Sequence, residues 1–127
     1  MDYRSMVRNI LLSWNTQFEE IKGGRFTIQL NQYRVMAIGF IGDSIHMGIM
    51  EPGVYAYLDR RKATLIGRKA AASHNVKYEQ SEKQPVFSIY IKPDNSDEEE
   101  LSGALEECKI DLEAAMDDFG KMVFRSK

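Results

Sequence analysis

The strongest constraint on the fold lies in the last third of the chain, where apolar residues recur at alternating steps of four and three. This spacing places them all on one face of an α-helix for three heptads. Ser96 stands before this run and Glu99 follows three residues later, which is the pattern of a capping box at a helix start. We therefore expect a long amphipathic helix over 97–122. Its apolar residues are Leu101, Leu105, Cys108, Leu112, Ala115, Phe119 and Met122.

A strand precedes this helix. Over 86–91, Phe87, Ile89 and Ile91 alternate with the residues between them, as expected for a strand with two different faces. Residues 76–80 predict another strand, and the polar stretch 81–84 predicts the turn that joins the two. The end of the chain is thus expected to fold as strand, turn, strand and long helix.

The first half of the chain changes period once. Apolar residues recur at helical spacing over 3–22, which predicts an amphipathic helix, and Gly23-Gly24 would end it. From Phe26 onward the period is two. Three strands with short turns then follow, at 26–30, 34–41 and 45–50, and they predict an antiparallel meander.

The segment 54–74 is ambiguous. Read as a helix, it places Val54, Leu58, Arg61 and Leu65 on one side. Read as a hairpin, strands 54–58 and 63–67 would flank a turn at 59–62. A helix is favoured because residues 60–62 include neither glycine nor asparagine, although Gly67 would cost such a helix about 1 kcal/mol relative to alanine.

The order of expected elements is α-β-β-β-α-β-β-α. It predicts a single α+β domain over 1–127, with an antiparallel sheet and long helices at both ends. With 127 residues, 43% apolar and 28% charged, the chain can bury a core without a metal or a disulfide. The start of the sequence lacks the features of a secretory signal, and the longest uncharged apolar stretch, 35–42, is too short to span a membrane. We therefore expect a cytoplasmic protein.

The sequence offers little chemistry. His46 and His74 have no metal-ligand spacing around them, and the single cysteine, Cys108, lies in an apolar seam where an inert buried thiol is expected. The carboxylate pairs 106–107 and 117–118 are adjacent on a helix and so point apart. Nucleophile-elbow, Walker A and dinucleotide-binding motifs are missing from the sequence. We expect no enzyme activity, no catalytic residue, no cofactor and no metal.

Charge is distributed unevenly. Residues 1–93 hold 13 Lys/Arg and 8 Asp/Glu, whereas residues 94–127 hold 4 and 11. A basic cluster between the two tyrosines at 55 and 57 and the alanines at 70–72 suggests nucleic-acid binding. The alternative is a solvated helix face, or a patch that pairs with the acidic C-terminal helix of its own or a neighbouring subunit. The cluster comprises Arg60, Arg61, Lys62, Arg68 and Lys69.

The stretch 35–41 is apolar on both alternating sets, so a strand there needs cover on two faces. The predicted terminal helices can cover one face of the sheet. The second face then requires the 54–74 helix, a twin subunit or a bound client, and methionines would make such a surface adaptable. We therefore expect a homodimer that contacts another protein through hydrophobic sheet surface. The candidate contact residues are Met36, Ile38, Phe40, Met50 and Tyr90.

Strand 76–80, the strand that ends in Lys92-Pro93 and the acidic helix started by Ser96 and Glu99 follow one another in a recognisable order. Together with the chain length and the mildly acidic isoelectric point, this layout resembles the type III secretion chaperone fold, which recurs in YbjN-type regulators. The resemblance is strongest over 76–122. It implies a homodimer without enzymatic activity that binds polypeptide along hydrophobic sheet patches.

The leading hypothesis is thus a non-enzymatic, dimeric α+β adaptor or chaperone-like protein with a polypeptide client and no membrane association. The first alternative is a nucleic-acid-binding accessory protein that uses the basic cluster between Arg60 and Lys69. The second alternative is a small-ligand sensor, with a pocket between the first helix and the sheet in which Trp14 and Tyr33 line the cavity.

Overall fold

The computed structural model describes residues 3–51, 59–80, 85–94 and 96–125. Within these ranges the six strands form one antiparallel sheet in the order β1-β2-β3-β4-β6-β5. The α+β class is confirmed, and β1 is an additional strand that the sequence pattern did not predict. The elements are α1 (Tyr3–Ser13), β1 (Phe18–Ile21), β2 (Arg25–Gln29), β3 (Val35–Ile41), β4 (Ser44–Met50), α2 (Arg60–Ser73), β5 (Lys77–Gln80), β6 (Pro85–Ile91) and α3 (Glu98–Arg125).

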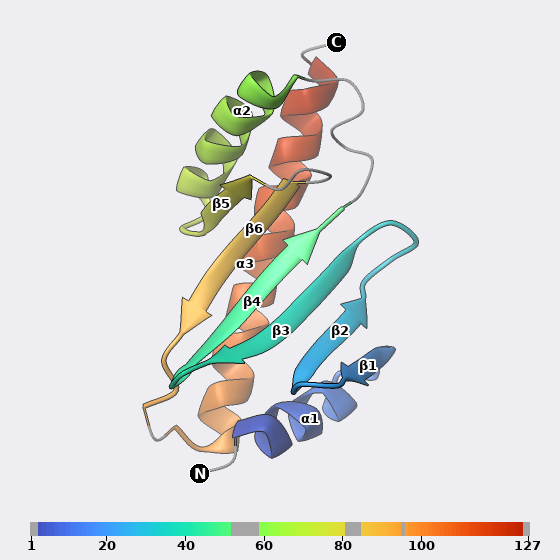
Figure 1. Ribbon diagram of the computed structural model, residues 1–127, viewed down its shortest axis with the longest axis vertical. Helices are drawn as coiled ribbons and strands as arrows, with labels where there is room; N and C mark the ends of the chain where they lie inside the picture. The colour runs from blue at the N-terminus through green and yellow to red at the C-terminus, as the bar shows by residue number, and fades with distance from the viewer. Residues whose placement is uncertain (1–2, 52–58, 81–84, 95, 126–127) are drawn as a thin grey trace.

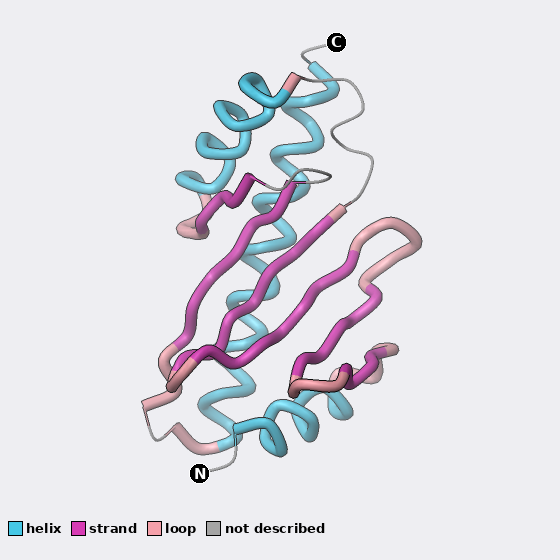
Figure 2. The backbone as a smooth tube through the Cα atoms, viewed as in Figure 1, coloured by secondary structure: helices cyan, strands magenta, loops and turns pink. Residues whose placement is uncertain are grey.

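The helices and the sheet form two layers. In Figure 1, α3 passes behind the strands along the length of the molecule, and α2 lies beside its C-terminal half. The packing agrees with this view: α3 contacts β4 and β6, α2 contacts α3 and β5, and α1 contacts α3. Figure 2 shows that the strands form one continuous layer in front of α3. The described helices thus pack on one face of the sheet.

The register of the sheet explains which side chains form the core. Phe26 pairs with Ile38, Ile38 with Met47, and Met47 with Ile89, so these side chains form one row across four strands. Because side chains alternate between the two faces of a strand, the whole alternate set points toward the helices. Phe26, Ile38 and Met47 are 0% exposed. The core therefore lies between this face of the sheet and the helices.

Helix α3 confirms the predicted heptad seam and places it inside the molecule. Leu105, Leu112 and Phe119 are 0% exposed, whereas Cys108 is only partly buried. Met116 and Val123 are also buried and widen the apolar stripe. The seam packs against β4 and β6 of its own chain. An apolar stripe of this width is suited to covering one face of a sheet.

The start of α3 differs from the predicted capping box. Asp97 is the capping residue, since its Oδ1 accepts a hydrogen bond from the backbone N–H of Glu100 at 2.8 Å. The Ser96 hydroxyl instead donates to the carbonyl of Pro93. The prediction was wrong by one residue because a carboxylate and a hydroxyl are both good N-caps, and the bend after Pro93 directs the Ser96 hydroxyl away from the helix.

The prediction of one helix over 3–22 was wrong after Ser13. Asn15 has φ 53°, which turns the chain, and residues 18–21 then form β1 beside β2. Apolar spacing did not distinguish the two states because Phe18 also contacts the core as a strand residue. Gly23 and Gly24, with φ 103° and 81°, form the hairpin turn between β1 and β2 instead of ending a helix.

The helical interpretation of 54–74 is confirmed over Arg60–Ser73. Asp59 caps α2, because its side chain accepts a hydrogen bond from the backbone N–H of Lys62 at 2.8 Å. The hairpin alternative is wrong for 63–67, which is helical, and the part of the segment at 54–58 lies outside the described residues. Asp59, a good N-cap five residues into the segment, was the missing signal.

Candidate protein-binding face of the sheet

The face of the sheet that points away from the helices is the first candidate site, and we call it the helix-free face. Its side chains form the second alternating set of the strands, and the described members of this set are absent from the hydrophobic core cluster. Most of them are apolar or small. The central strands contribute Val35, Ala37, Gly39, Ile41, His46, Gly48, Met50, Val86, Ser88 and Tyr90 to it.

The structure divides the predicted contact residues between the two faces. Met36 and Ile38 are 0% exposed beneath the helices, and Phe40 packs against the same core. These three are core residues, so their assignment to an interaction surface was wrong. Met50 and Tyr90 do lie on the helix-free face, where Tyr90 is 46% exposed.

The residues of the helix-free face that the prediction missed are sequence neighbours or strand partners of the predicted contact residues. Val35 and Ala37 alternate with Met36, and Val86 pairs with Met50 across the strands β4 and β6. Both alternating sets of 35–41 are apolar, so the sequence could not say which set faces the helices. The register with β2 was the missing signal, because the polar residues of β2 mark the face that stays uncovered.

Polar groups gather on this face around Tyr90. The His46 ring packs against the Tyr90 ring with 4.6 Å between centroids, and the Nζ of Lys77 lies 5.4 Å from the Tyr90 centroid. Ser88 is 0% exposed. Its Oγ and the Nε2 of His46 are buried without a hydrogen-bond partner among the described residues. Both atoms lie beneath the surface, so they are unsatisfied polar groups within the sheet and not contacts presented to a ligand.

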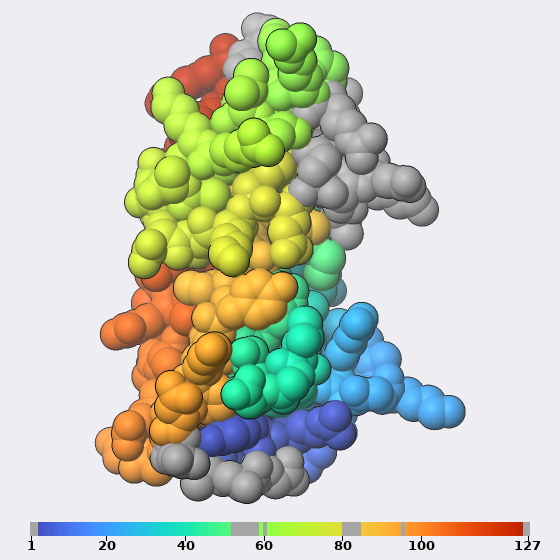
Figure 3. Space-filling model, turned by 60° about the vertical axis from the view of Figure 1, so that its left-hand side comes forward, coloured from blue at the N-terminus to red at the C-terminus, as the bar shows by residue number. Residues whose placement is uncertain are grey.

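The edge of β6 is open beside these residues. Strand β5 pairs with β6 only from Lys77, opposite Ser88, to Gln80, opposite Pro85. Ile89, Tyr90 and Ile91 therefore pair with β4 on one side and have no strand on the other among the described residues. A hollow of about 350 Å³ lies next to this edge, lined by Asn75, Val76, Lys77, Ser88, Ile89 and Tyr90. Figure 3 shows this side of the molecule, with β5 in yellow above the orange β6.

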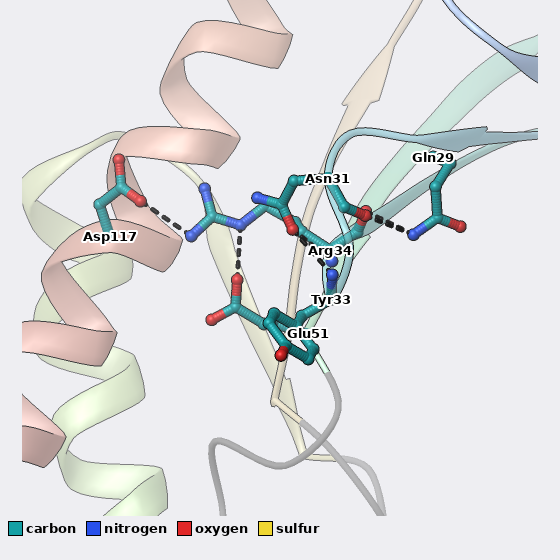
Figure 4. A network of polar contacts seen from close by, with 6 residues as sticks. All are labelled: Gln29, Asn31, Tyr33, Arg34, Glu51 and Asp117. Atoms are coloured by element: carbon teal, nitrogen blue, oxygen red, sulfur yellow. Dashed lines mark hydrogen bonds and ion pairs between the residues drawn. The ribbon is translucent and has the colours of Figure 1, made fainter.

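A buried cation fixes one end of the sheet. Arg34, 9% exposed, donates to Glu51 Oε1 and Asp117 Oδ1, each at 2.8 Å (Figure 4). Burial alone would lower the pKa of Arg34, but the hydrogen bonds that it donates to the two carboxylates more than compensate, and its pKa is raised. Asn31 Oδ1 accepts hydrogen bonds from the backbone N–H groups of Tyr33 and Arg34, which shapes the turn before β3. These contacts have a structural role: they join the turn before β3, the residue after β4, and α3.

A second hollow of about 580 Å³ lies between the end of α1 and the middle of α3. Trp14 lines it, as the small-ligand hypothesis expects, together with Leu30 and Ile110. Tyr33 does not: it lies on the turn between β2 and β3 and is 64% exposed. The ion pair between Lys109 and Glu113, at 2.7 Å, crosses the wall of this hollow. Its lining is mostly polar, with Ser13, Asn15, Thr16 and Glu106 beside the ion pair, so it differs from the predominantly apolar pockets that hold drug-sized ligands.

The basic cluster lies on α2. Arg61, Lys62, Arg68 and Lys69 are all exposed. Arg60 is the first residue of the helix, and its side chain lies outside the described part of the chain, as do Tyr55 and Tyr57. The rings that would accompany the cations at a nucleic-acid surface are thus not placed by the structure.

The two remaining titratable candidates are His74 and Cys108, and neither has the surroundings of a catalytic group. His74 Nε2 contacts Asp118 Oδ2 where α2 meets α3. Burial, with added repulsion from Asp111 and Glu107, raises the pKa of the Cys108 thiol to about 11, so this thiol is protonated at neutral pH. The part of the chain that the structure describes contains no group of three metal-ligating side chains. It also contains no helix that is both long and apolar enough to span a bilayer.

The fold is that of a single YbjN-like α+β domain. No family model and no curated protein matches the chain. The crystal structure of YbjN, a proposed transcription regulator from E. coli, superposes with a TM-score of 0.64 at 11% identity, covering 95% of this chain and 92% of that chain. The crystal structure of an uncharacterized protein from Methanothermobacter thermautotrophicus gives 0.61 at 12% identity, with 94% and 98% covered. The predicted resemblance in layout is confirmed at the level of the fold.

Proposed function

We propose that this protein is a non-enzymatic polypeptide-binding protein, which works as a homodimer and holds an extended segment of another protein on the helix-free face. The observation that carries the proposal is the one-sided packing of the domain. The helices cover one face of the sheet, and the other face presents Val35, Ala37, Met50 and Val86 without a described helix above them. Apolar sheet surface that a domain leaves uncovered marks an interaction site.

An extended polypeptide fits this surface better than a compact ligand does. The open edge of β6 at 89–91 offers backbone groups to a new strand, and such pairing gives affinity that depends little on sequence. Val86 and Tyr90 are each two strand positions from the buried Ser88 and lie on the same face, so alternate side chains of a bound segment would meet apolar contacts. The resemblance to secretion chaperones, which implies polypeptide binding by a homodimer, supports the same function.

The test uses the full chain and a reduced, carboxymethylated unfolded protein as the client. We expect the wild type to bind this client and to slow its aggregation. Ala37→Glu places a carboxylate in the middle of the helix-free face, where it would need to be desolvated, and should weaken binding at least about tenfold. Gln32→Glu, at an exposed turn position, is the matched control and should bind as the wild type does.

Circular dichroism and thermal unfolding show whether both variants keep the wild-type fold. Equal client affinity of the wild type and folded Ala37→Glu would reject the helix-free face as the binding site. A wild type that fails to bind the unfolded client would reject the function itself.

Nucleic-acid binding is the second candidate function, and one observation favours it. The exposed cations of α2 include Arg61 and Arg68, and they have no ion-pair partner among the described residues. Phosphate contacts would make such binding fall steeply as salt rises from 50 to 200 mM. Fluorescence anisotropy with labelled single- and double-stranded oligonucleotides tests it, with Arg68→Glu as the variant that should lose affinity.

A further inference from the structure

The exposed surface of α2 combines positive charge with one apolar side chain. Arg61, Lys62, Arg68 and Lys69 lie at helical spacings that put them on one face, around Leu65. Leu65 is 62% exposed. The helix has no acidic residue between Arg60 and Ser73. This surface, which we call the basic face of α2, is thus an apolar side chain surrounded by cations.

The exposed surface of α3 has the opposite character. Ile110 is 64% exposed, and Glu106 and Glu107 precede it by four and three residues, so their side chains are its neighbours on the helix surface. Both glutamates are exposed and have no ion-pair partner among the described residues. Asp111 follows directly. This surface, the acidic face of α3, is an apolar side chain with Glu106 and Glu107 on its N-terminal side. Lys109, which directly precedes Ile110, is paired with Glu113.

We propose that the two faces bind each other between copies of this chain: the basic face of α2 in one copy docks on the acidic face of α3 in a second copy, and the reverse contact closes the dimer. A twofold dimer needs this reciprocity, because each partner supplies both halves of the interface. Leu65 of one copy would then lie against Ile110 of the other, with the charges arranged around them. This inference rests on the dimer in the proposed function and specifies how it forms, leaving the helix-free face to the client.

The chemistry of the two faces favours a second copy over a nucleic acid. A phosphate backbone would make no favourable apolar contact with the exposed Leu65, whereas Ile110 of a second copy would. The α2 residues 60–73 include no aromatic ring on which a base could stack. Helix α2 also packs against α3, and α3 belongs to the acidic end of the chain, which would repel a polyanion near α2.

The experiment reverses the charge of each face separately. Arg68→Glu/Lys69→Glu makes the α2 face acidic, and Glu106→Lys/Glu107→Lys makes the α3 face basic. We expect the wild type to dimerise in sedimentation equilibrium, and each double variant to dissociate at least about tenfold more readily because like charges then meet. All four positions are exposed, so the variants should keep the wild-type melting temperature. Lys92→Glu, an exposed reversal outside both faces, should dimerise as the wild type does.

Mixing the two double variants gives the decisive result. In a mixed dimer the reversed α2 meets the reversed α3, and the native α2 meets the native α3, so both contacts are complementary again. We expect a heterodimer with affinity within about threefold of the wild-type homodimer, and a loss of affinity with rising salt. Two variants that each stay dimeric would overturn the proposal, and so would two monomeric variants that fail to combine.

Two further results would also overturn it. One is a wild type that stays monomeric. The other is loss of oligonucleotide binding by Arg68→Glu/Lys69→Glu with an unchanged mass, which would assign the basic face to nucleic acid. Client binding is scored in the same samples with Ala37→Glu as the comparison. Double variants that stay dimeric while the wild type binds the client reject only this inference. A wild type that dimerises through these faces but does not bind the client rejects only the polypeptide-binding function.

Discussion

Gly67 of α2 and Tyr78 of β5 are in such close contact that a β-carbon at residue 67 would lie 2.3 Å from the Tyr78 ring. The ring itself is held on its other sides, with its centroid 5.3 Å from that of Phe87 and 6.0 Å from that of Phe119. A glycine inside a helix, which costs stability in an isolated helix, thus allows α2 to approach the sheet edge.

Gly67→Ala should therefore destabilise the protein by about 1–3 kcal/mol, although alanine is the better helix former, because the added methyl group overlaps the ring. Urea unfolding gives the free energy. In a Tyr78→Ala background the overlap is gone, and Gly67→Ala should instead stabilise the protein by about 1 kcal/mol. Stabilisation by Gly67→Ala in the wild-type background would contradict the close packing.

Arg34→Met should cost about 2–4 kcal/mol of unfolding free energy, because it removes the only described cation that pairs with the half-buried Glu51. The Asp117 side chain is 56% exposed, so water can replace its partner. Asp117→Asn should therefore cost less than about 1 kcal/mol. Chemical denaturation of the two variants checks the order, and equal losses would show that the network is not centred on Glu51.

Asp97→Ala should destabilise α3 by about 1 kcal/mol, because it removes the acceptor for the Glu100 amide and a negative charge at the helix N-terminus. Ser96→Ala should have the smaller effect, since its hydroxyl donates to Pro93 and does not cap the helix. Thermal unfolding of both variants ranks them. A larger loss for Ser96→Ala would favour the capping box that the sequence pattern predicted.

Cys108 should react slowly with iodoacetamide at pH 8 in the folded protein, because its pKa is about 11 and only the thiolate reacts. The rate should rise about tenfold per pH unit up to that pKa. In the urea-unfolded chain the pKa returns toward 9.0, so the reaction at pH 8 should be much faster. Fast labelling of the folded protein at pH 8 would contradict the burial of the thiol.

The same shift makes stability depend on pH. Folding raises the pKa of Cys108, so the folded state favours the protonated thiol. The stabilisation from the neutral thiol is present below the unfolded pKa of 9.0 and is lost as the pH rises toward 11. Between pH 8 and 10.5 the urea midpoint of the wild type should fall more than that of Cys108→Ser, which lacks this titration. Parallel curves would show that the thiol does not contribute.

The sequence was most informative where one periodicity persisted. The seam of α3 could be recognised from residues such as Leu105, Leu112 and Phe119, because a three-heptad repeat satisfies only a helix with one buried side. Strands β2 and β6 were recognised from their alternation of period two, and β3 from its continuous apolar run. Residues 14–22 were misassigned because Phe18 and Ile21 continue the helical spacing, and only pairing with β2 makes them a strand.

The candidate site could be anticipated as a kind of surface, but its residues could not be chosen. Residues 35–41 alone indicate that the sheet has a second apolar face besides the one that the terminal helices cover. Whether Met36 or Ala37 belongs to that face depends on register, which moves every side chain of a strand to the other face when it shifts by one residue. Register is set by partners far away in the sequence, and local patterns do not encode them.

The sequence by itself determined the elements with a strong period, the single α+β domain, and the opposite charges of α2 and α3. Local physics is sufficient there, since periodicity and charge are properties of a segment. Only the tertiary structure decided that α3 packs inward, that the helices of the described residues all lie on one sheet face, and that Leu65 and Ile110 are exposed among opposite charges. These features depend on packing, because each helix or strand settles where the other elements leave apolar surface that it can bury.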